Sequence, residues 1–353
     1  MHTRICKISD LQEQQEEIEE AGRILAGGGL VAFPTETVYG LGANGFDADA
    51  CAAIYEAKGR PSDNPLILHV SDRKMVDRVA ADVPELAERL FAAFCPGPIT
   101  IILHRRACVP GTVTGGLDTV GIRMPEHDIA RAMIRAAGVP IAAPSANLSG
   151  RPSPTTAQAV YRDMQGRIPL ILDGGSCRFG VESTIVEGMG EKLTILRPGA
   201  ITREMLAEVA GDGNVSIDPA IVGVKAVPKA PGMKYTHYAP KAPLTLIEGV
   251  PGKMIPAFRR QLRRLAEEGQ TAGIIVSDEV AEAVADFVRP EFICRYGAQG
   301  ALPVIAANLY EALRSFDDKP IDCLLAEGTA ECGLGLAIMN RLHKASGFRS
   351  IQA

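Results

Sequence analysis

Three polar segments of the sequence carry residue types suited to binding a small polar or phosphorylated molecule, and each lies beside an apolar run. The first reads FPTETVYGLG at 33–42 and combines hydroxyls with glycines that let a ligand approach the backbone. The second reads KGRPSDNPL at 58–66 and holds two cations. The third reads AAPSANLSGRPS at 142–153, a layout suited to donating hydrogen bonds to phosphate oxygens.

Each segment also has a purely structural interpretation. The hydroxyls of the first segment are typical of a buried strand end that caps the next helix. Lys58 and Arg60 follow a predicted helix, where cations often interact with the helix dipole. Ser and Asn turns like the third segment are common in loops. An arginine after a strand, such as Arg123 or Arg197, often forms a surface ion pair. The isolated residues therefore leave both interpretations open.

Other catalytic signatures are missing from the sequence. There is no GxxxxGK[ST] loop, no HExxH pair and no Cys/His cluster, so neither a P-loop nor a protein-held metal is indicated. The absence of GxSxG argues against a hydrolase nucleophile elbow. The six histidines form no obvious catalytic pair.

The elements that must position these segments alternate between short apolar runs and amphipathic stretches. The first helix, from Ser9 to about Leu25, has capping-box spacing between Ser9 and Gln12 and ends before three glycines. The alternation predicts an α/β domain with a sheet of many strands and mixed direction. Expected strands are 30–33, 66–70, 99–104, 121–124, 140–143, 170–172, 183–186 and 193–196, and expected helices are 48–58, 84–94, 127–137, 156–164 and 202–209.

Periodicity fails between 211 and 243, where Gly, Pro, Lys and Tyr accumulate. We interpret this stretch as an interdomain linker between domains at 1–210 and 244–353. Its Lys234, Tyr235, His237 and Tyr238 also suit a lid that closes over the site and excludes water, or a linker that merely packs on the domain surface.

A second α/β alternation follows the linker and predicts a small parallel, Rossmann-like sheet. No GxGxxG follows its first strand, so dinucleotide binding is not indicated. Expected strands are 244–247, 273–277, 292–295 and 323–326, and expected helices are 253–268, 279–287, 303–316 and 335–345.

The composition predicts a soluble protein of the cytoplasm. Of 353 residues, 46% are hydrophobic and 22% charged, and the net charge of −5 argues against a chain-wide grip on nucleic acid. Eight cysteines without a CxxC pair fit reduced thiols. The N-terminus resembles no signal peptide, and no apolar run reaches the roughly 18 residues of a membrane span.

Taken in order, these segments closely resemble the YrdC-like family of threonylcarbamoyl-AMP synthases in its longer, two-domain form. The resemblance covers essentially the whole chain. It implies an open, twisted mixed sheet whose concave face forms a basic cleft, followed by the smaller Rossmann-like domain. The segments that carry it are FPTETVYGLG at 33–42, KGRPSDNPLILHV at 58–70, CPGPIT at 95–100, GIRMP at 121–125, PSANLSG at 144–150, STIV at 183–186, RPG at 197–199 and PGMKYTHYAP at 231–240.

The resemblance also implies a nucleotidyltransferase reaction. The amine of L-threonine captures CO₂ or bicarbonate, and the carbamate attacks the α-phosphate of ATP, so that diphosphate leaves and threonylcarbamoyl-AMP forms. Mg²⁺ accompanies the ATP. A tRNA-modifying transferase complex then uses the product to make threonylcarbamoyladenosine next to the anticodon, and a weak tRNA contact is expected. Because the carbamate is already an anion, the reaction needs positioning and cations more than a strong base.

Residue roles follow from the same resemblance. Lys58 and Arg60 are expected to be catalytic, and Arg123 to bind the threonine carboxylate with two hydrogen bonds. The residues expected to bind ATP are Lys58, Arg60, Asn64, Thr119, Ser145, Asn147, Ser153, Arg197, Tyr235 and His237. Those expected to bind L-threonine are Thr37, His69, Arg123, Ala143 and Ser183.

Two rival functions remain open at this point. One is a non-catalytic protein that binds double-stranded RNA or tRNA in the same cleft, against which the acidic net charge and the set Thr37, Arg123 and Ser183 count. The other is a carbamoyltransferase of the hydrogenase-maturation type, which contains a related domain but also zinc-finger cysteines that this chain lacks. Residues 244–353 show no catalytic constellation, so a regulatory or docking role is also open for them.

Overall fold

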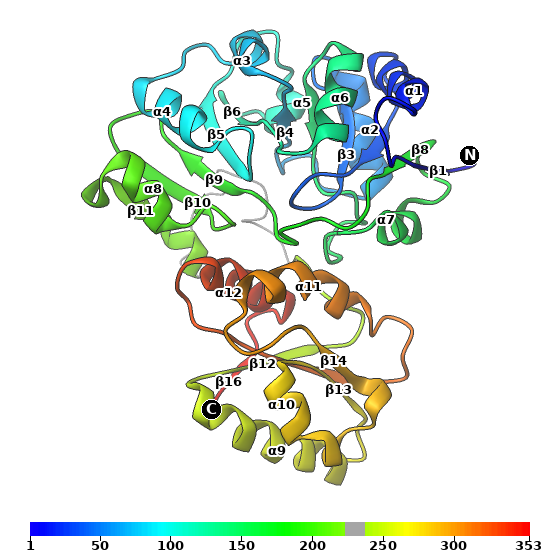
Figure 1. Cartoon of the computed structure of the whole chain (residues 1–353), viewed down its shortest axis with the longest axis vertical. Helices are drawn as coiled ribbons and strands as arrows, with labels where there is room; N and C mark the ends of the chain where they lie inside the picture. The colour runs from blue at the N-terminus through cyan, green and yellow to red at the C-terminus, as the bar shows by residue number, and fades with distance from the viewer. Residues whose placement is uncertain (223–236) are drawn as a thin grey trace. The chain divides into compact units, whose positions relative to one another are not determined.

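The computed structural model describes residues 1–222 and 237–353 and divides the chain into two compact units (Figure 1). The first unit comprises Met1–Ser149 and continues from Ser153 to the undescribed stretch. The second comprises Gly150–Pro152 and the chain that follows that stretch. Each unit has its own sheet.

The described part of the first unit forms one 11-stranded sheet. In chain order its strands are β1 (Arg4–Lys7), β2 (Val31–Phe33), β3 (Gly40–Asn44), β4 (Ile67–His69), β5 (Ile99–His104), β6 (Thr119–Arg123), β7 (Ile141–Ala143), β8 (Leu170–Asp173), β9 (Thr184–Glu187), β10 (Leu193–Arg197) and β11 (Val215–Ile217). Across the sheet the order is β1-β8-β2-β3-β7-β4-β6-β5-β9-β10-β11. Strand β6 pairs parallel with β4 and antiparallel with β5, which confirms the predicted mixed sheet.

The helices of the first unit follow the predicted alternation, and Figure 1 shows α1, α3, α4 and α6 on one side of the strands. They are α1 (Gln15–Ala26), α2 (Ala48–Lys58), α3 (Arg73–Val79), α4 (Glu85–Phe94), α5 (Gly111–Thr114), α6 (Asp128–Ala137), α7 (Ala157–Met164) and α8 (Arg203–Ala210). Helix α2 has the bounds expected from the sequence. Its N-cap Asp47 accepts from two backbone N–H groups, and Gly59 ends it at φ 60°, in the left-handed region.

The two faces of the central strands have different roles. Leu68, Ile101 and Ile122 point into the main core, which the helices cover. Because side chains alternate along a strand, their neighbours point to the opposite face. There Ile67 and Ile102 join a small separate apolar cluster. This opposite face, called the site face below, carries the candidate site.

Some elements escaped the sequence reasoning. Strand β3 reads GLGAN and was hidden by its glycines, which are needed because a Cβ on Gly40 would lie 2.9 Å from the Phe33 ring. The capping box expected at Ser9 is wrong: α1 starts at Gln15, and the Gln14 side chain accepts from the Ser9 and Asp10 N–H groups instead. The stretch predicted as a linker contains a strand near its start, β11, which pairs with β10.

The second unit contains a five-stranded parallel sheet in its described residues, ordered β14-β13-β15-β12-β16. Helices α9 and α10 lie on one side of it and α11 and α12 on the other, which confirms the Rossmann-like prediction (Figure 1). The elements are β12 (Leu244–Glu248), α9 (Pro251–Glu267), β13 (Ala272–Val276), α10 (Asp278–Ala283), β14 (Ile293–Arg295), α11 (Leu302–Arg314), β15 (Cys323–Glu327), α12 (Leu334–Ala345) and β16 (Ser350–Gln352).

None of the described helices combines the length and the apolar character needed to cross a membrane. Each of the eight cysteines lies in the described part of the chain and is a free thiol.

Candidate functional site

Neighbouring strands of the first unit bring polar side chains together at one end of the site face. His69 on β4 and Arg123 on β6 are register partners. Thr100 on β5 and Ser183, just before β9, share a hydrogen bond of 2.8 Å between their hydroxyls. All four side chains are buried. The sheet register therefore assembles a polar group from segments far apart in the sequence.

The Arg123 guanidinium contacts the loop between β2 and β3. Its Nη2 donates to Thr37 Oγ1 at 2.8 Å and to Thr35 Oγ1 at 3.4 Å, and it lies 2.9 Å from Glu36 Oε1. The Arg123 and Glu36 side chains are 5% and 3% exposed. The PTET turn thus places two hydroxyls and a carboxylate around one buried cation.

His69 is held as a neutral imidazole. Its ring is buried, and its Nδ1 lies 3.2 Å from the Ile67 carbonyl oxygen. Burial, assisted by the positive charges of Arg123 and Arg197, lowers the pKa of His69 to about 3. His69 therefore contributes a hydrogen-bonding ring, and no positive charge, near neutral pH.

Arg197 reaches this region through an irregularity in β10. Ile195 pairs with Val186 and Arg197 pairs with Ile185, so the register shifts between positions 195 and 197. In a regular strand, residue 197 would share the core-facing side of Ile195. The bulge aligns Arg197 with Ile185 on the site face. Its guanidinium donates from Nε to the Ser183 carbonyl and from Nη2 to the Ser183 hydroxyl, both at 3.0 Å.

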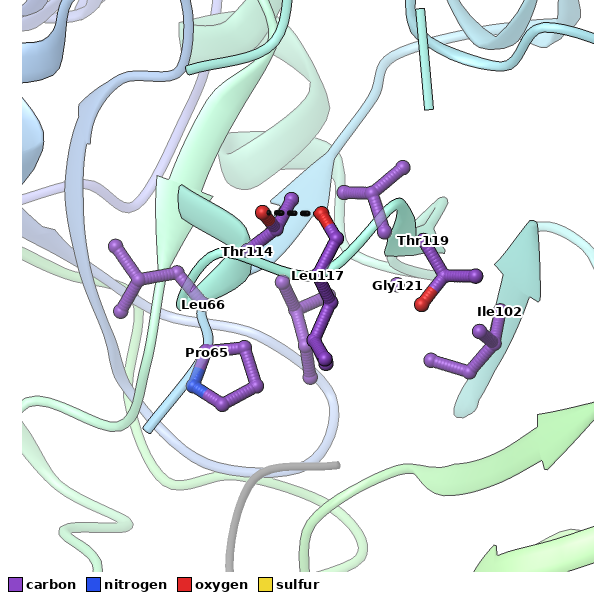
Figure 2. A pocket seen from close by; sticks show the side chains of 9 residues that line it. Pro65, Leu66, Ile102, Thr114, Leu117, Thr119 and Gly121 are labelled. Atoms are coloured by element: carbon purple, nitrogen blue, oxygen red, sulfur yellow. Dashed lines mark hydrogen bonds between the residues drawn. The ribbon is translucent and has the colours of Figure 1, made fainter. Parts of the chain in front are cut away.

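The other end of the site face is apolar and hollowed (Figure 2). Thr119, Gly121 and Arg123 alternate along β6, so the hollow and the buried cation lie on one strand. A Cβ on Gly121 would lie only 3.0 Å from Thr100 Cγ2, which shows how closely packed the floor is. The hollow is lined by Pro65, Leu66, Ile67, Ile102, Thr114, Leu117, Thr119, Val120 and Gly121.

Lys58 is buried against the loop that follows β7. Its Nζ donates to the carbonyl oxygens of Ser145 and Asn147, both at 2.5 Å. The Ser145 hydroxyl donates to Asn147 Oδ1 at 2.5 Å, and the Ser149 N–H donates to the Lys58 carbonyl at 2.9 Å. The end of α2 and the PSANLSG loop, separated widely in sequence, are thereby joined around one ammonium group.

Arg60 and Asn64 lie in the turn between α2 and β4. The Arg60 guanidinium donates to the carbonyls of Asn64 at 3.3 Å and Pro65 at 3.2 Å, and Asn64 is buried. Ala143 on β7 pairs with Ile67, so its methyl lies on the site face. These residues stand around the same strands as the polar group and the hollow.

The remaining residues predicted to bind ATP are Ser153, Tyr235 and His237, and they lie in different parts of the chain. The Ser153 hydroxyl donates to Glu182 Oε1 at 2.6 Å, next to Ser183 in sequence. His237 belongs to the second unit, where its ring lies 5.5 Å from that of Tyr238. Tyr235 lies outside the described residues, as does Lys234. The assignment of Tyr235 and His237 to ATP stays a prediction, and so does the lid.

Sequence reasoning missed three residues with prominent positions. Glu36 lies inside the first polar segment, and a carboxylate between two threonines after a buried strand was a usable signal. Glu182 precedes Ser183 and carried a similar one. Thr100 gave no signal, because only the sheet register places it beside Ser183.

Comparisons with known proteins cover both units. A family profile described as "Telomere recombination" matches residues 23–199, and one described as "Threonylcarbamoyl-AMP synthase, C-terminal domain" matches residues 201–347. The chain is 45% identical over 348 residues to the threonylcarbamoyl-AMP synthase of Bacillus subtilis, across 97% of this chain and 96% of that protein. It is also 45% identical over 348 residues to the Pyrococcus abyssi protein of that name, across 98% and 99%.

The chain belongs to the threonylcarbamoyl-AMP synthase family. Its fold is similar to the crystal structure of P. abyssi Sua5 complexed with L-threonine, with a TM-score of 0.93 and 44% identity over 99% of this chain and 100% of that one. The predicted family, fold class and enzyme class are confirmed. The family membership also favours the enzyme over the rival RNA-binding function.

Proposed function

We propose that this chain converts L-threonine, bicarbonate and ATP into threonylcarbamoyl-AMP and diphosphate. The proposal is carried by one observation, the membership of the whole chain in the threonylcarbamoyl-AMP synthase family. The site face offers matching chemistry, since a buried polar group and an apolar hollow lie side by side on the same strands. An amino acid and a nucleotide need these two environments.

The polar end of the site face suits L-threonine. Arg123 can pair with the substrate carboxylate, and Thr37 and Ser183 offer hydroxyls within the same buried group. The neutral His69 ring adds a hydrogen-bonding partner, and the small Ala143 side chain leaves room for the ligand. Discrimination against serine then rests on packing around one methyl group, worth on the order of 1–3 kcal/mol.

The apolar end suits the nucleotide base. Ile67, Ile102 and Gly121 line the hollow, and Thr119 supplies a hydroxyl to the same lining (Figure 2). Arg60 donates to the Pro65 carbonyl beside the hollow, and Arg197 donates to Ser183 in the polar group. These cations would offset the charge of the triphosphate as the carbamate oxygen attacks the α-phosphate. Asn64, Ser145, Asn147 and Ser153 would add hydrogen bonds to the nucleotide.

Lys58 acts on the nucleotide through the loop it holds. Its ammonium donates to two carbonyls of the PSANLSG loop, and this organises the backbone and side chains of Ser145 and Asn147. We therefore assign Lys58 to positioning the loop, in addition to any charge it contributes to the phosphates.

The Mg²⁺ that accompanies ATP would be held chiefly by the phosphate oxygens. Among the described residues, the group of three His or carboxylate side chains spaced for a metal is Glu248, Glu331 and His343, all in the second unit. Around the site face the hydroxyls and amides of Ser145, Asn147 and Ser153 are the groups able to contact the hydrated ion. Bound there, Mg²⁺ would withdraw charge from the triphosphate.

The partners and location remain part of the proposal. The labile product must pass to a transferase complex that modifies tRNA, with at most a weak tRNA contact by this chain, as its net charge of −5 suggests. No membrane partner is proposed. Free thiols at all eight cysteines fit the reducing cytoplasm.

The direct test is diphosphate release from ATP by the full chain. We expect release only when L-threonine and bicarbonate are both present, and its loss in Arg60→Ala. Release that does not depend on threonine, or tight binding of double-stranded RNA without any release, would overturn the proposal in favour of another function.

A further inference from the structure

Glu36 is a buried carboxylate that the described chain leaves without a hydrogen bond. Its side chain is 3% exposed, and neither Oε1 nor Oε2 accepts a hydrogen bond from the described residues. Its backbone is fixed, because the Phe179 N–H donates to the Glu36 carbonyl at 2.8 Å. A buried charge without hydrogen bonds is costly and rare in folded proteins.

Glu182 shows how this chain normally treats such a group. It is also buried on the first unit, but its Oε1 accepts a hydrogen bond from the Ser153 hydroxyl at 2.6 Å. Glu36 lies between Thr35 and Thr37, yet both hydroxyls are directed to other partners. Of these two buried carboxylates, only Glu36 lacks a hydrogen-bond donor among the described residues.

Arg123 balances the charge of Glu36 but does not satisfy its hydrogen bonds. The Nη2–Oε1 distance is 2.9 Å, but the contact is not aligned as a hydrogen bond, and the same Nη2 donates to Thr37 Oγ1 at 2.8 Å. Arg123 Nε is likewise buried without an acceptor among the described residues. An ion pair in this state has lost its hydration without full compensation.

The other cation of the polar group, Arg197, donates to the Ser183 carbonyl and hydroxyl, and the histidines and the thiol around the pair are neutral. Burial lowers the pKa of His127, which keeps that imidazole neutral, and its Nδ1 is also without a partner in the described chain. Burial raises the pKa of Cys95 to about 12, so that thiol is neutral too. His69, as described above, is neutral as well. The pair is thus one positive and one negative group, buried beside neutral imidazoles and a neutral thiol, while Arg197 is bonded to Ser183.

An α-amino acid has the complementary charges on adjacent atoms. Its carboxylate matches Arg123, and its ammonium, with three N–H donors, matches a carboxylate that lacks donors. A zwitterion entering here keeps the net charge at zero and supplies the missing hydrogen bonds.

We propose that Glu36 binds the α-ammonium group of L-threonine and thereby selects α-amino acids over α-hydroxy acids. This rests on the proposed function, which places L-threonine at the polar end of the site face. It extends that function by dividing recognition of the substrate between the two members of one buried ion pair. It also fixes the nitrogen that becomes the carbamate.

The test is isothermal titration of the full chain with two ligands, L-threonine and the 2,3-dihydroxybutanoate of matching stereochemistry, in which a hydroxyl replaces the ammonium. In Glu36→Gln we expect the Kd for L-threonine to rise about 10- to 100-fold, the range for a hydrogen bond to a charged group. The Kd for the hydroxy acid should change by less than about threefold, because its hydroxyl carries no positive charge and can donate to the amide oxygen of glutamine as it does to a carboxylate.

Two further variants control the result. Glu126→Gln removes a carboxylate that is 49% exposed and paired with Arg178, and it should leave both affinities unchanged. Glu36→Asp keeps the charge on a shorter side chain, so it should retain the preference for the amino acid even if Glu36→Gln folds poorly.

The outcomes distinguish a failure of the role given to Glu36 from a failure of the proposed function. Equal weakening of both ligands in Glu36→Gln, or no weakening of L-threonine, would overturn the role of Glu36. If wild type binds neither ligand and releases no diphosphate, the proposed function itself fails.

Discussion

Two buried polar regions of the first unit treat their charges in opposite ways. In one, the Lys58 ammonium is surrounded by carbonyl oxygens of the PSANLSG loop and is used to hold that loop. In the other, Glu36 and Arg123 lie side by side with hydrogen-bonding atoms that no described residue satisfies. Both regions follow buried strands, and both looked alike in the sequence.

The difference indicates what each region is built for. A charge that makes hydrogen bonds to backbone groups of its own chain, like that of Lys58, contributes to folding and to the conformation of the loop it contacts. A charge kept buried with hydrogen bonds unmade costs free energy in the ligand-free state, and a ligand that supplies those hydrogen bonds would recover it. Substitutions in the two regions should therefore differ in size, in pH dependence and in their effect on each substrate.

The largest effect is expected for Arg123→Met. It leaves the Glu36 carboxylate buried without a counter-charge, which should lower the free energy of unfolding by about 3–5 kcal/mol. Urea denaturation followed by circular dichroism would measure this loss. The double variant Glu36→Gln with Arg123→Met should recover more than half of it, since the orphan charge is removed too. A loss no larger than that of a surface arginine would mean that the pair is not buried as described.

Lys58→Met should have the next largest effect on stability. Two loop carbonyls lose their donor, which should lower the free energy of unfolding by about 1–3 kcal/mol. The same denaturation measurement applies, with the exposed Lys74→Met as a matched control that should change little. If Lys58 served the phosphates alone, its substitution would abolish diphosphate release while leaving stability intact.

How much of this was predictable from sequence depends on the kind of signal. Strong periodicity located most strands and helices, and β5 and α2 have the predicted bounds. The segments that hold Thr37, Lys58 and Ser145 were also found, because they contain unusual polar residues after apolar runs. The partners of those residues were not predictable, since they depend on sheet register, and the bulge that turns Arg197 onto the site face leaves no mark in the sequence.

Because His69 is buried, the free energy of unfolding should depend on pH. Its pKa is lowered to about 3 in the folded chain, whereas an unfolded histidine titrates near about 6.5. Below that value the unfolded chain binds a proton that the folded chain does not, so stability falls as pH decreases. The slope from this group is about 1.4 kcal/mol per pH unit. We expect wild type to lose stability more steeply than His69→Gln when the pH is lowered from 7 to 5, because the buried His127 contributes to both proteins and His69 only to wild type. Parallel slopes would contradict the buried, neutral assignment of His69.

The smallest effect is expected for Thr100→Val. This isosteric change removes the 2.8 Å hydrogen bond to Ser183 while keeping the apolar contacts, so stability should fall by about 0.5–1.5 kcal/mol. The affinity for L-threonine should fall several-fold as the Ser183 hydroxyl loses its orientation. Thermal unfolding and titration together would check it, and a large loss of ATP affinity instead would place Ser183 at the nucleotide end.

The central claim is that one face of the sheet binds the amino acid at its polar end and the nucleotide at its apolar end. Separate titrations of ATP and L-threonine into Gly121→Ala and Thr37→Val test it most directly. The methyl group added in Gly121→Ala crowds Ile67 and Ile102 in the hollow and also contacts the Thr100 methyl. We expect it to weaken ATP binding about tenfold and L-threonine binding by no more than about threefold. Thr37→Val, which removes a hydroxyl bonded to Arg123, should do the reverse. If either variant weakened both ligands equally, or if the pattern were exchanged, the division of the site face would be wrong.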